Sequence, residues 1–169
     1  MNQQESSFLA NVVPAALSTQ KLFGVPASIT IAQAIAESGW GQSALAKQAN
    51  NFFGIKALAH ADPNAYAEFP THEFVDGREV SVMCAFAKYP SPLDSFLAHA
   101  RLLALAPRYK PAMAERNDPA AFATQLQKCG YSTSPDYAVA LIKLINEYDL
   151  RQYDVQPIDQ PATQKLPTQ

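Results

Sequence analysis

Residues 32–56 read AQAIAESGWGQSALAKQANNFFGIK, and this stretch decides the fold. It continues an apolar pattern with helical spacing that includes Ile31 and Ile35, and Glu37 ends that pattern just before Gly39. A carboxylate at the point where a helix gives way to a glycine-rich turn can lie in a groove, where apolar surroundings raise its pKa. The plainer alternative is a solvated glutamate at a helix end.

Three further blocks favour a groove. They are residues 50–56 (NNFFGIK), residues 71–74 (THEF) with an Asp-Gly pair at 76–77, and residues 130–138 (GYSTSPDYA). Together with residues 32–41, these blocks resemble, in the same order, the bacterial endo-β-N-acetylglucosaminidase family. This is the glycoside hydrolase family 73 type found in flagellar and autolytic peptidoglycan hydrolases. The resemblance covers about residues 7–150, and the four blocks together are highly specific.

The resemblance implies an α+β fold that is mainly helical, a lysozyme-like domain with a small β-hairpin lobe. It also implies a hydrolase that cleaves the β-1,4 bond after N-acetylglucosamine in peptidoglycan. Glu37 takes the role of the catalytic acid, for which a raised pKa is required. Glu73 is implied as the second catalytic group, with Glu68 and Glu79 as rivals, and Tyr131 as a catalytic residue of the groove. Two mechanisms stay open: inversion through a water that a carboxylate activates, and attack by the substrate's own N-acetyl group.

Large side chains beside the acid are candidates for substrate binding. Trp40 and Phe53 carry rings that can stack on the apolar faces of sugars, although Trp40 can equally pack under the helix end. Asn51 is grouped with them, and it can also tie down its own loop. Tyr137 faces the core in the pattern of the last helix, which favours packing.

Composition permits one hydrophobic core in 169 residues with a formal net charge of −2. This charge gives no electrostatic case for nucleic acid, and no apolar run is long enough for a membrane span. No metal site is predicted, since His60, His72 and His99 are scattered, and no cofactor is expected. Cys84 and Cys129 could form a disulfide or be two small buried residues, and the sequence leaves both open.

The N-terminal residues MNQQESSFLANVV lack the charged and apolar regions of a secretory signal. Action in the periplasm or cell wall would then need a dedicated secretion system or release by lysis. With the slight negative charge, this favours an antibacterial effector delivered into a rival's periplasm, with a cognate immunity protein as its inhibitor. A phage or prophage endolysin is the alternative.

The pattern predicts one catalytic domain over residues 1–153 and a disordered tail over residues 154–169. Helices are expected over 8–22, 26–38 and 43–48, from Ser91, from Asp118 to Gly130, and from Ser134 onward. A β-lobe is expected over 66–89, with its turn at Asp-Gly 76–77.

Two other functions fit the same helical scaffold. A muramidase or lytic transglycosylase would use Glu37 as its main acid, and the other possibility is a non-catalytic wall-binding or scaffold module that kept the fold. Retention of Glu37, Glu73 and Tyr131 together argues against the binding module.

Overall fold

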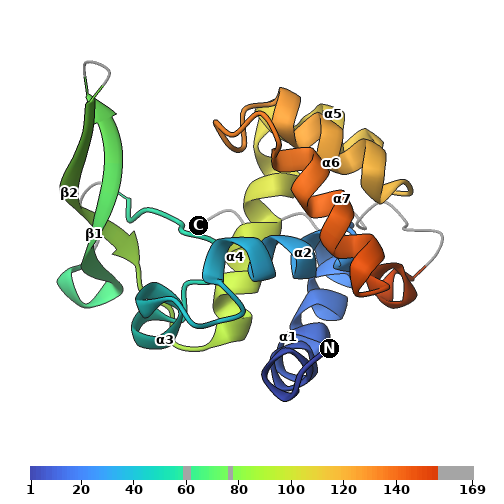
Figure 1. Cartoon of the computed structure of the whole chain (residues 1–169), viewed down its shortest axis with the longest axis horizontal. Coiled ribbons are helices and arrows are strands. Elements are labelled where there is room, and N and C mark those ends of the chain that lie inside the picture. The colour runs from blue at the N-terminus through green and yellow to red at the C-terminus, as the bar shows by residue number, and fades with distance from the viewer. Residues whose placement is uncertain (59–61, 76–77, 156–169) are drawn as a thin grey trace, which may run out of the picture.

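The computed structural model describes residues 1–58, 62–75 and 78–155. Its elements in chain order are α1 (Gln3–Phe23), α2 (Ala27–Ser38), α3 (Ala44–Ala49), η1 (Pro63–Ala65), β1 (Tyr66–Val75), β2 (Arg78–Ala87), α4 (Pro92–Leu105), η2 (Pro107–Tyr109), α5 (Lys110–Ala114), α6 (Pro119–Lys128), α7 (Tyr137–Glu147) and η3 (Leu150–Tyr153). The helices form one body, and the β1–β2 hairpin stands at its side (Figure 1).

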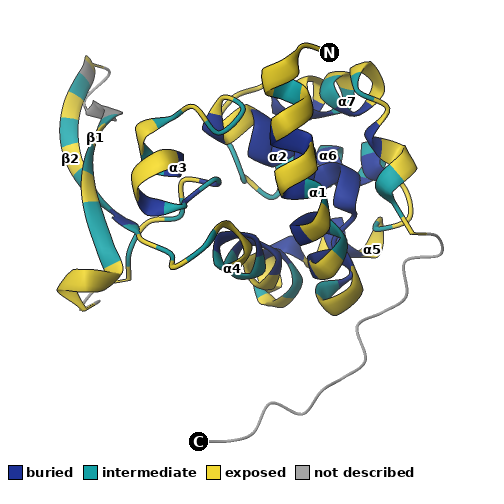
Figure 2. Ribbon diagram, turned by 90° about the horizontal axis from the view of Figure 1, so that it is seen from below, coloured by how far each residue is buried: buried dark blue, intermediate teal, exposed yellow. Residues whose placement is uncertain are grey.

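Helix α2 lies at the centre of the helical body, where it contacts α1, α6, α7 and η3. All its residues from 27 to 35 are buried, which explains the near-continuous apolar pattern of this segment (Figure 2). Gly24 ends α1 in the left-handed conformation at φ 71°, so that the chain can turn at once into α2. Only the last turn of α2 reaches the surface.

The turn after α2 has an unusual backbone. Gly39, Trp40 and Gly41 all have positive φ, at 56°, 59° and 71°. A Cβ on Gly41 would be strained by the positive φ, and it would lie 3.2 Å from the Phe8 ring, so that the ring would have to shift by a few tenths of an ångström. The Ser38 hydroxyl accepts a hydrogen bond from the Gly41 amide at 2.8 Å and closes the turn. The chain therefore leaves α2 at Gly39, two residues after Glu37, as the glycines predicted.

The β-lobe is a two-stranded antiparallel hairpin whose register runs from Tyr66 opposite Ala87 to Val75 opposite Arg78. Alternation along β2 is as predicted, because Phe86 is buried whereas Met83, on the opposite face, is 61% exposed. The expected turn at 76–77 lies outside the described residues. Backbone bonds of 2.9 Å from Ala57 to Ala85 and from Ala87 to Ile55 fasten the hairpin to the helical body.

Several element boundaries differ from those expected. Helix α1 starts at Gln3, because Asn2 and Glu5 form a reciprocal capping box, and it tolerates Pro14. Helix α7 starts at Tyr137, two residues after the predicted Ser-Pro. At this start, the Gln127 side chain accepts a hydrogen bond from the backbone amide of Ala138 at 2.8 Å.

The predicted tail begins at residue 154, yet Asp154 and the backbone of Val155 are hydrogen-bonded to the body. Asp154 accepts hydrogen bonds from the Ser28 amide at 2.8 Å and the Ser28 hydroxyl at 2.7 Å at the start of α2. Val155 bonds to Gln20 of α1 through its backbone. Residues 156–169 lie outside the described part of the chain.

The structure also bears on the possible disulfide and on membrane spans. Cys84 and Cys129 are not joined by a disulfide. Among the described residues, no helix is both long and apolar enough to cross a membrane.

Candidate active site

The last turn of α2 and the first turn of α7 meet around one carboxylate. The Tyr137 hydroxyl donates to Glu37 Oε1 at 3.3 Å, and it accepts from Gln33 Nε2 at 2.8 Å. Gln33 lies one helical turn before Glu37 on α2 and is fully buried, and Tyr137 is only 7% exposed. The three side chains form a hydrogen-bonded chain from the core to the surface.

Glu37 is exposed along part of its side chain, but its carboxyl lies against the buried phenol of Tyr137. The surrounding protein atoms displace water from the carboxyl, and this desolvation raises its pKa. The hydrogen bond from Tyr137 acts in the opposite direction and only partly offsets the desolvation. The carboxyl thus keeps its proton to higher pH than an ordinary glutamate, as a catalytic acid must.

Tyr131 lies on the loop after α6, close enough to Glu37 to feel its charge. Gly130 turns the chain at φ 71°, and Arg108 holds the loop by donating to the carbonyls of Cys129 at 2.6 Å and Gly130 at 2.9 Å. The Tyr131 ring stacks on Tyr137 with centroids 5.5 Å apart. Burial, together with the Glu37 charge, raises the pKa of Tyr131, so its hydroxyl remains a neutral hydrogen-bond donor.

Behind these tyrosines lies a layer of buried rings. The imidazole of His99 stacks on Phe53 at 3.9 Å and meets the edge of Tyr131 at 6.1 Å. Burial lowers the pKa of His99 to about 3, which keeps the ring neutral. Phe53 is only 5% exposed, so the structure places it in the core and not at a surface on which a sugar could stack.

The other two predicted substrate-binding residues also make structural contacts. Asn51 is 1% exposed and donates to the carbonyls of Ile55 at 2.8 Å and Ala87 at 2.9 Å, which ties its loop to β2. The Trp40 ring packs edge-on against Phe8 at 5.5 Å and Tyr148 at 4.8 Å. Trp40 therefore lies under the helix end, on the side of α1 and η3.

The second predicted catalytic group is on the hairpin. Glu73 lies in β1 opposite Val80, but its side chain lies outside the described part of the structure, as does that of Glu79. Glu68 is an exposed residue of β1 opposite Ala85. The described residues hold no group of His, Cys, Asp and Glu side chains that could bind a metal ion.

The site thus unites Glu37 and Tyr131 with three residues that the sequence did not assign to it: Tyr137, Gln33 and Arg108. Tyr137 was interpreted as a packing residue, because its position in the apolar stripe of α7 does not reveal its hydroxyl contact. Gln33 carried a weak signal, since it is a polar residue in the buried stripe of α2. Nothing in the sequence around Arg108 indicated its contact with the Tyr131 loop, which lies more than 20 residues further along the chain.

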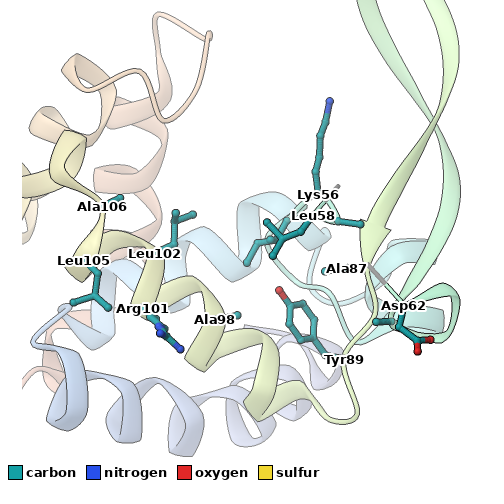
Figure 3. A pocket seen from close by; sticks show the side chains of 13 residues that line it. Lys56, Leu58, Asp62, Ala87, Tyr89, Ala98, Arg101, Leu102, Leu105 and Ala106 are labelled. Carbon is teal, nitrogen blue, oxygen red and sulfur yellow. The ribbon is translucent and has the colours of Figure 1, made fainter. Parts of the chain in front are cut away.

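A separate groove of 780 Å³ lies between α4 and the segment that leads into the hairpin (Figure 3). Leu58, from the segment that leads into the hairpin, and Leu102 of α4 both line it, and the Tyr89 hydroxyl points into it. Burial raises the pKa of Tyr89. Glu37, Tyr131 and Tyr137 are not among the lining residues, so this groove is separate from the cluster around Glu37.

Sequence comparison identifies one family over most of the chain. The family described as "Mannosyl-glycoprotein endo-beta-N-acetylglucosaminidase" matches residues 13–150. The exo-glucosaminidase LytG of Bacillus subtilis is 39% identical over 132 residues, which are 75% of this chain and 45% of LytG. The peptidoglycan hydrolase FlgJ of Pseudomonas aeruginosa is 36% identical over 78% of this chain and 34% of FlgJ. The chain thus spans less than half the length of these curated relatives.

Solved structures share the fold. The catalytic domain of the autolysin Auto from Listeria monocytogenes superposes with a TM-score of 0.78 at 30% identity, over 91% of this chain and 89% of that domain. A type VI secretion effector–immunity complex from Pseudomonas protegens matches with a TM-score of 0.60 over 90% of this chain and 94% of that one. Its identity is 20%, which is a likeness of fold alone.

Proposed function

The chain belongs to the glucosaminidase family, and from that premise we propose that it hydrolyses peptidoglycan at the β-1,4 bond after N-acetylglucosamine. The observation that carries the proposal is the carboxyl of Glu37 at the exit of α2, desolvated and bonded to the neutral hydroxyl of Tyr137. Similarity to LytG, FlgJ and Auto supports the choice of substrate.

In the proposed reaction, Glu37 donates its proton to the glycosidic oxygen as the bond from that oxygen to C1 breaks. The leaving sugar departs with a new hydroxyl, and positive charge develops on the remaining sugar ring. Glu37 is then a carboxylate, and the hydroxyl of Tyr137 stabilises its new charge by a charge-assisted hydrogen bond. Water completes the reaction by adding its oxygen to C1 and giving up a proton.

We assign the activation of water to Glu73 on the hairpin. A carboxylate on a lobe beside the helical body suits a water on the face opposite to the acid, the geometry of inversion. Direct attack by the N-acetyl oxygen is the other route, and it would leave Glu73 only an orienting role. The anomeric configuration of the first product distinguishes the two.

Digestion of purified peptidoglycan followed by mass spectrometry of the reduced products tests the function. The proposal expects reducing-end N-acetylglucosamine. Reducing or anhydro N-acetylmuramic acid would instead identify a muramidase or lytic transglycosylase. No released fragments from the folded protein would favour a wall-binding module.

The proposed substrate lies in the periplasm or cell wall, so the site of action is proposed to lie there as well. An antibacterial effector role with a cognate immunity protein is proposed as the biological setting. An inhibitor would act most directly by covering Glu37, because every substrate requires the acid.

A further inference from the structure

Gln33 is fully buried, and its side chain has one hydrogen-bond partner among the described residues. Its Nε2 donates to Tyr137 at 2.8 Å, whereas its Oε1 is buried without a hydrogen-bond partner among the described groups. A half-satisfied amide in the interior costs stability relative to an apolar side chain of the same shape. The contact with Tyr137 is therefore the feature of this residue that calls for an explanation.

The phenol of Tyr137 has one proton to give. Because Gln33 donates to the Tyr137 oxygen, that oxygen acts as the acceptor in this bond, and its own proton is left for Glu37 Oε1 at 3.3 Å. Consecutive hydrogen bonds in such a chain also polarise one another. A phenol hydroxyl that accepts one hydrogen bond is therefore a stronger donor in the next.

We propose that Gln33 is a positioning residue for the reaction: its amide directs the Tyr137 hydroxyl proton toward Glu37 and thereby holds the carboxyl of the acid in place. The catalytic part of this statement rests on the proposed function. The hydrogen-bond relay itself does not, and it can be tested without substrate.

Few other titratable groups face this relay within the described residues. Tyr131 stacks on Tyr137 from the loop after α6, and Tyr109 lies 5.9 Å from Tyr131 between ring centroids. His99 of α4 lies on the far side of Tyr131 and remains neutral above about pH 3. Tyr131 and Tyr137 keep their protons because burial raises the pKa of each hydroxyl. Titration between pH 4 and 8 is therefore expected to report Glu37.

Replacement of Gln33 by methionine keeps the length of the side chain but removes the donor. The Tyr137 bond to Glu37 should weaken, and the pKa of Glu37 should rise because that bond favours its charged form. An acid with a higher pKa stays protonated longer, so the basic limb of the pH–rate profile should move to higher pH. The maximal kcat should fall by about 2- to 10-fold, the loss typical of one hydrogen bond.

The test is a 13C NMR titration of the Glu37 carboxyl, assigned with Glu37→Gln, in wild type, Gln33→Met, Tyr137→Phe and the double variant. Thr30→Val is the matched control, because Thr30 is equally buried on α2 but bonds only to the Pro26 carbonyl at 3.2 Å. Gln33→Asn, which keeps an amide but withdraws it by one methylene, replaces Gln33→Met if that variant does not fold.

We expect Gln33→Met and Tyr137→Phe each to raise the Glu37 titration midpoint, and the double variant to match Tyr137→Phe alone. Thr30→Val should leave the midpoint unchanged. An unchanged midpoint in folded Gln33→Met, or additive shifts in the double variant, would overturn the proposal. Because the titration needs no substrate, an inactive wild-type enzyme with the expected shifts would refute the proposed function and leave the relay standing.

Discussion

The raised pKa of Glu37 suits a catalytic acid but lowers the stability of the folded protein at higher pH. Its pKa is raised in the folded chain, so the native state holds this proton more tightly than the unfolded chain does. The resulting stabilisation is complete below the unfolded-chain pKa of about 4.3 and is lost as the pH rises through the folded value. Above the folded value, the native state carries a desolvated charge.

Glu37→Gln should therefore gain stability relative to wild type as the pH rises. The raised pKa costs wild type stability once the pH exceeds the unfolded-chain pKa, and the amide, which cannot ionise, escapes this cost at pH 7 but has no such advantage at pH 3. Calorimetric melting temperatures of both proteins at the two pH values measure this difference. A difference that is independent of pH would mean that the pKa of Glu37 is not raised.

Glu73→Gln should impair hydrolysis by an amount that reports the mechanism. If Glu73 activates water, the loss should be about 10²- to 10⁴-fold, as for other acid–base groups, and the wild-type product should show inversion at C1 by NMR. Retention at C1 with a small loss would support attack by the N-acetyl group. Full activity in the variant would contradict a catalytic role for Glu73, and loss of activity in Glu68→Gln would assign the role to that rival on the same strand.

The loop between α3 and the hairpin is held in place by the hydrogen bonds of one side chain, that of Asn51. Asn51 satisfies the carbonyls of Ile55 and Ala87 and also accepts from the Ile55 amide at 3.1 Å. Since it is 1% exposed, water cannot easily replace these bonds. The hairpin therefore takes its position partly from Asn51.

Asn51→Ala should lower the free energy of unfolding by about 2–4 kcal/mol, because it leaves buried backbone groups without a hydrogen-bond partner. Urea denaturation followed by circular dichroism gives the value. Asn64→Ala, at an exposed position of η1 near the base of the hairpin, should change it by less than about 0.5 kcal/mol. Equal effects of the two substitutions would show that Asn51 does not anchor the loop.

Helices and strands were predictable from the sequence where neighbouring residues alone determine where the element begins and ends. Helix α2 and its exit were predictable because Gly39 and Gly41 supply positive φ, and the hairpin was predictable from alternation along β2. The contact between Tyr137 and Glu37 was not, because it joins residues 100 positions apart and depends on how α7 packs on α2. The role of Arg108 in holding the Tyr131 loop is likewise a product of tertiary packing.

The whole molecule combines a helical body, which holds the acid, with a hairpin that carries the second candidate group. The proposed substrate is a polymer that lies outside the cytoplasm. Production of the protein in a Gram-negative host should therefore be harmful only when an export leader carries it to the periplasm, and Glu37→Gln should remove that harm. Growth curves of the four strains test this, and equal toxicity without the leader would exclude wall cleavage as the cause.

The central claim is that Glu37 protonates the leaving oxygen at the bond after N-acetylglucosamine. The most direct measurement is product analysis of purified peptidoglycan digested by wild type and by Glu37→Gln, with circular dichroism to show that both are folded. Wild type should release fragments with reducing-end N-acetylglucosamine, and the variant should be slower by about 10²- to 10⁴-fold. Near-wild-type release of the same fragments by folded Glu37→Gln would contradict the account.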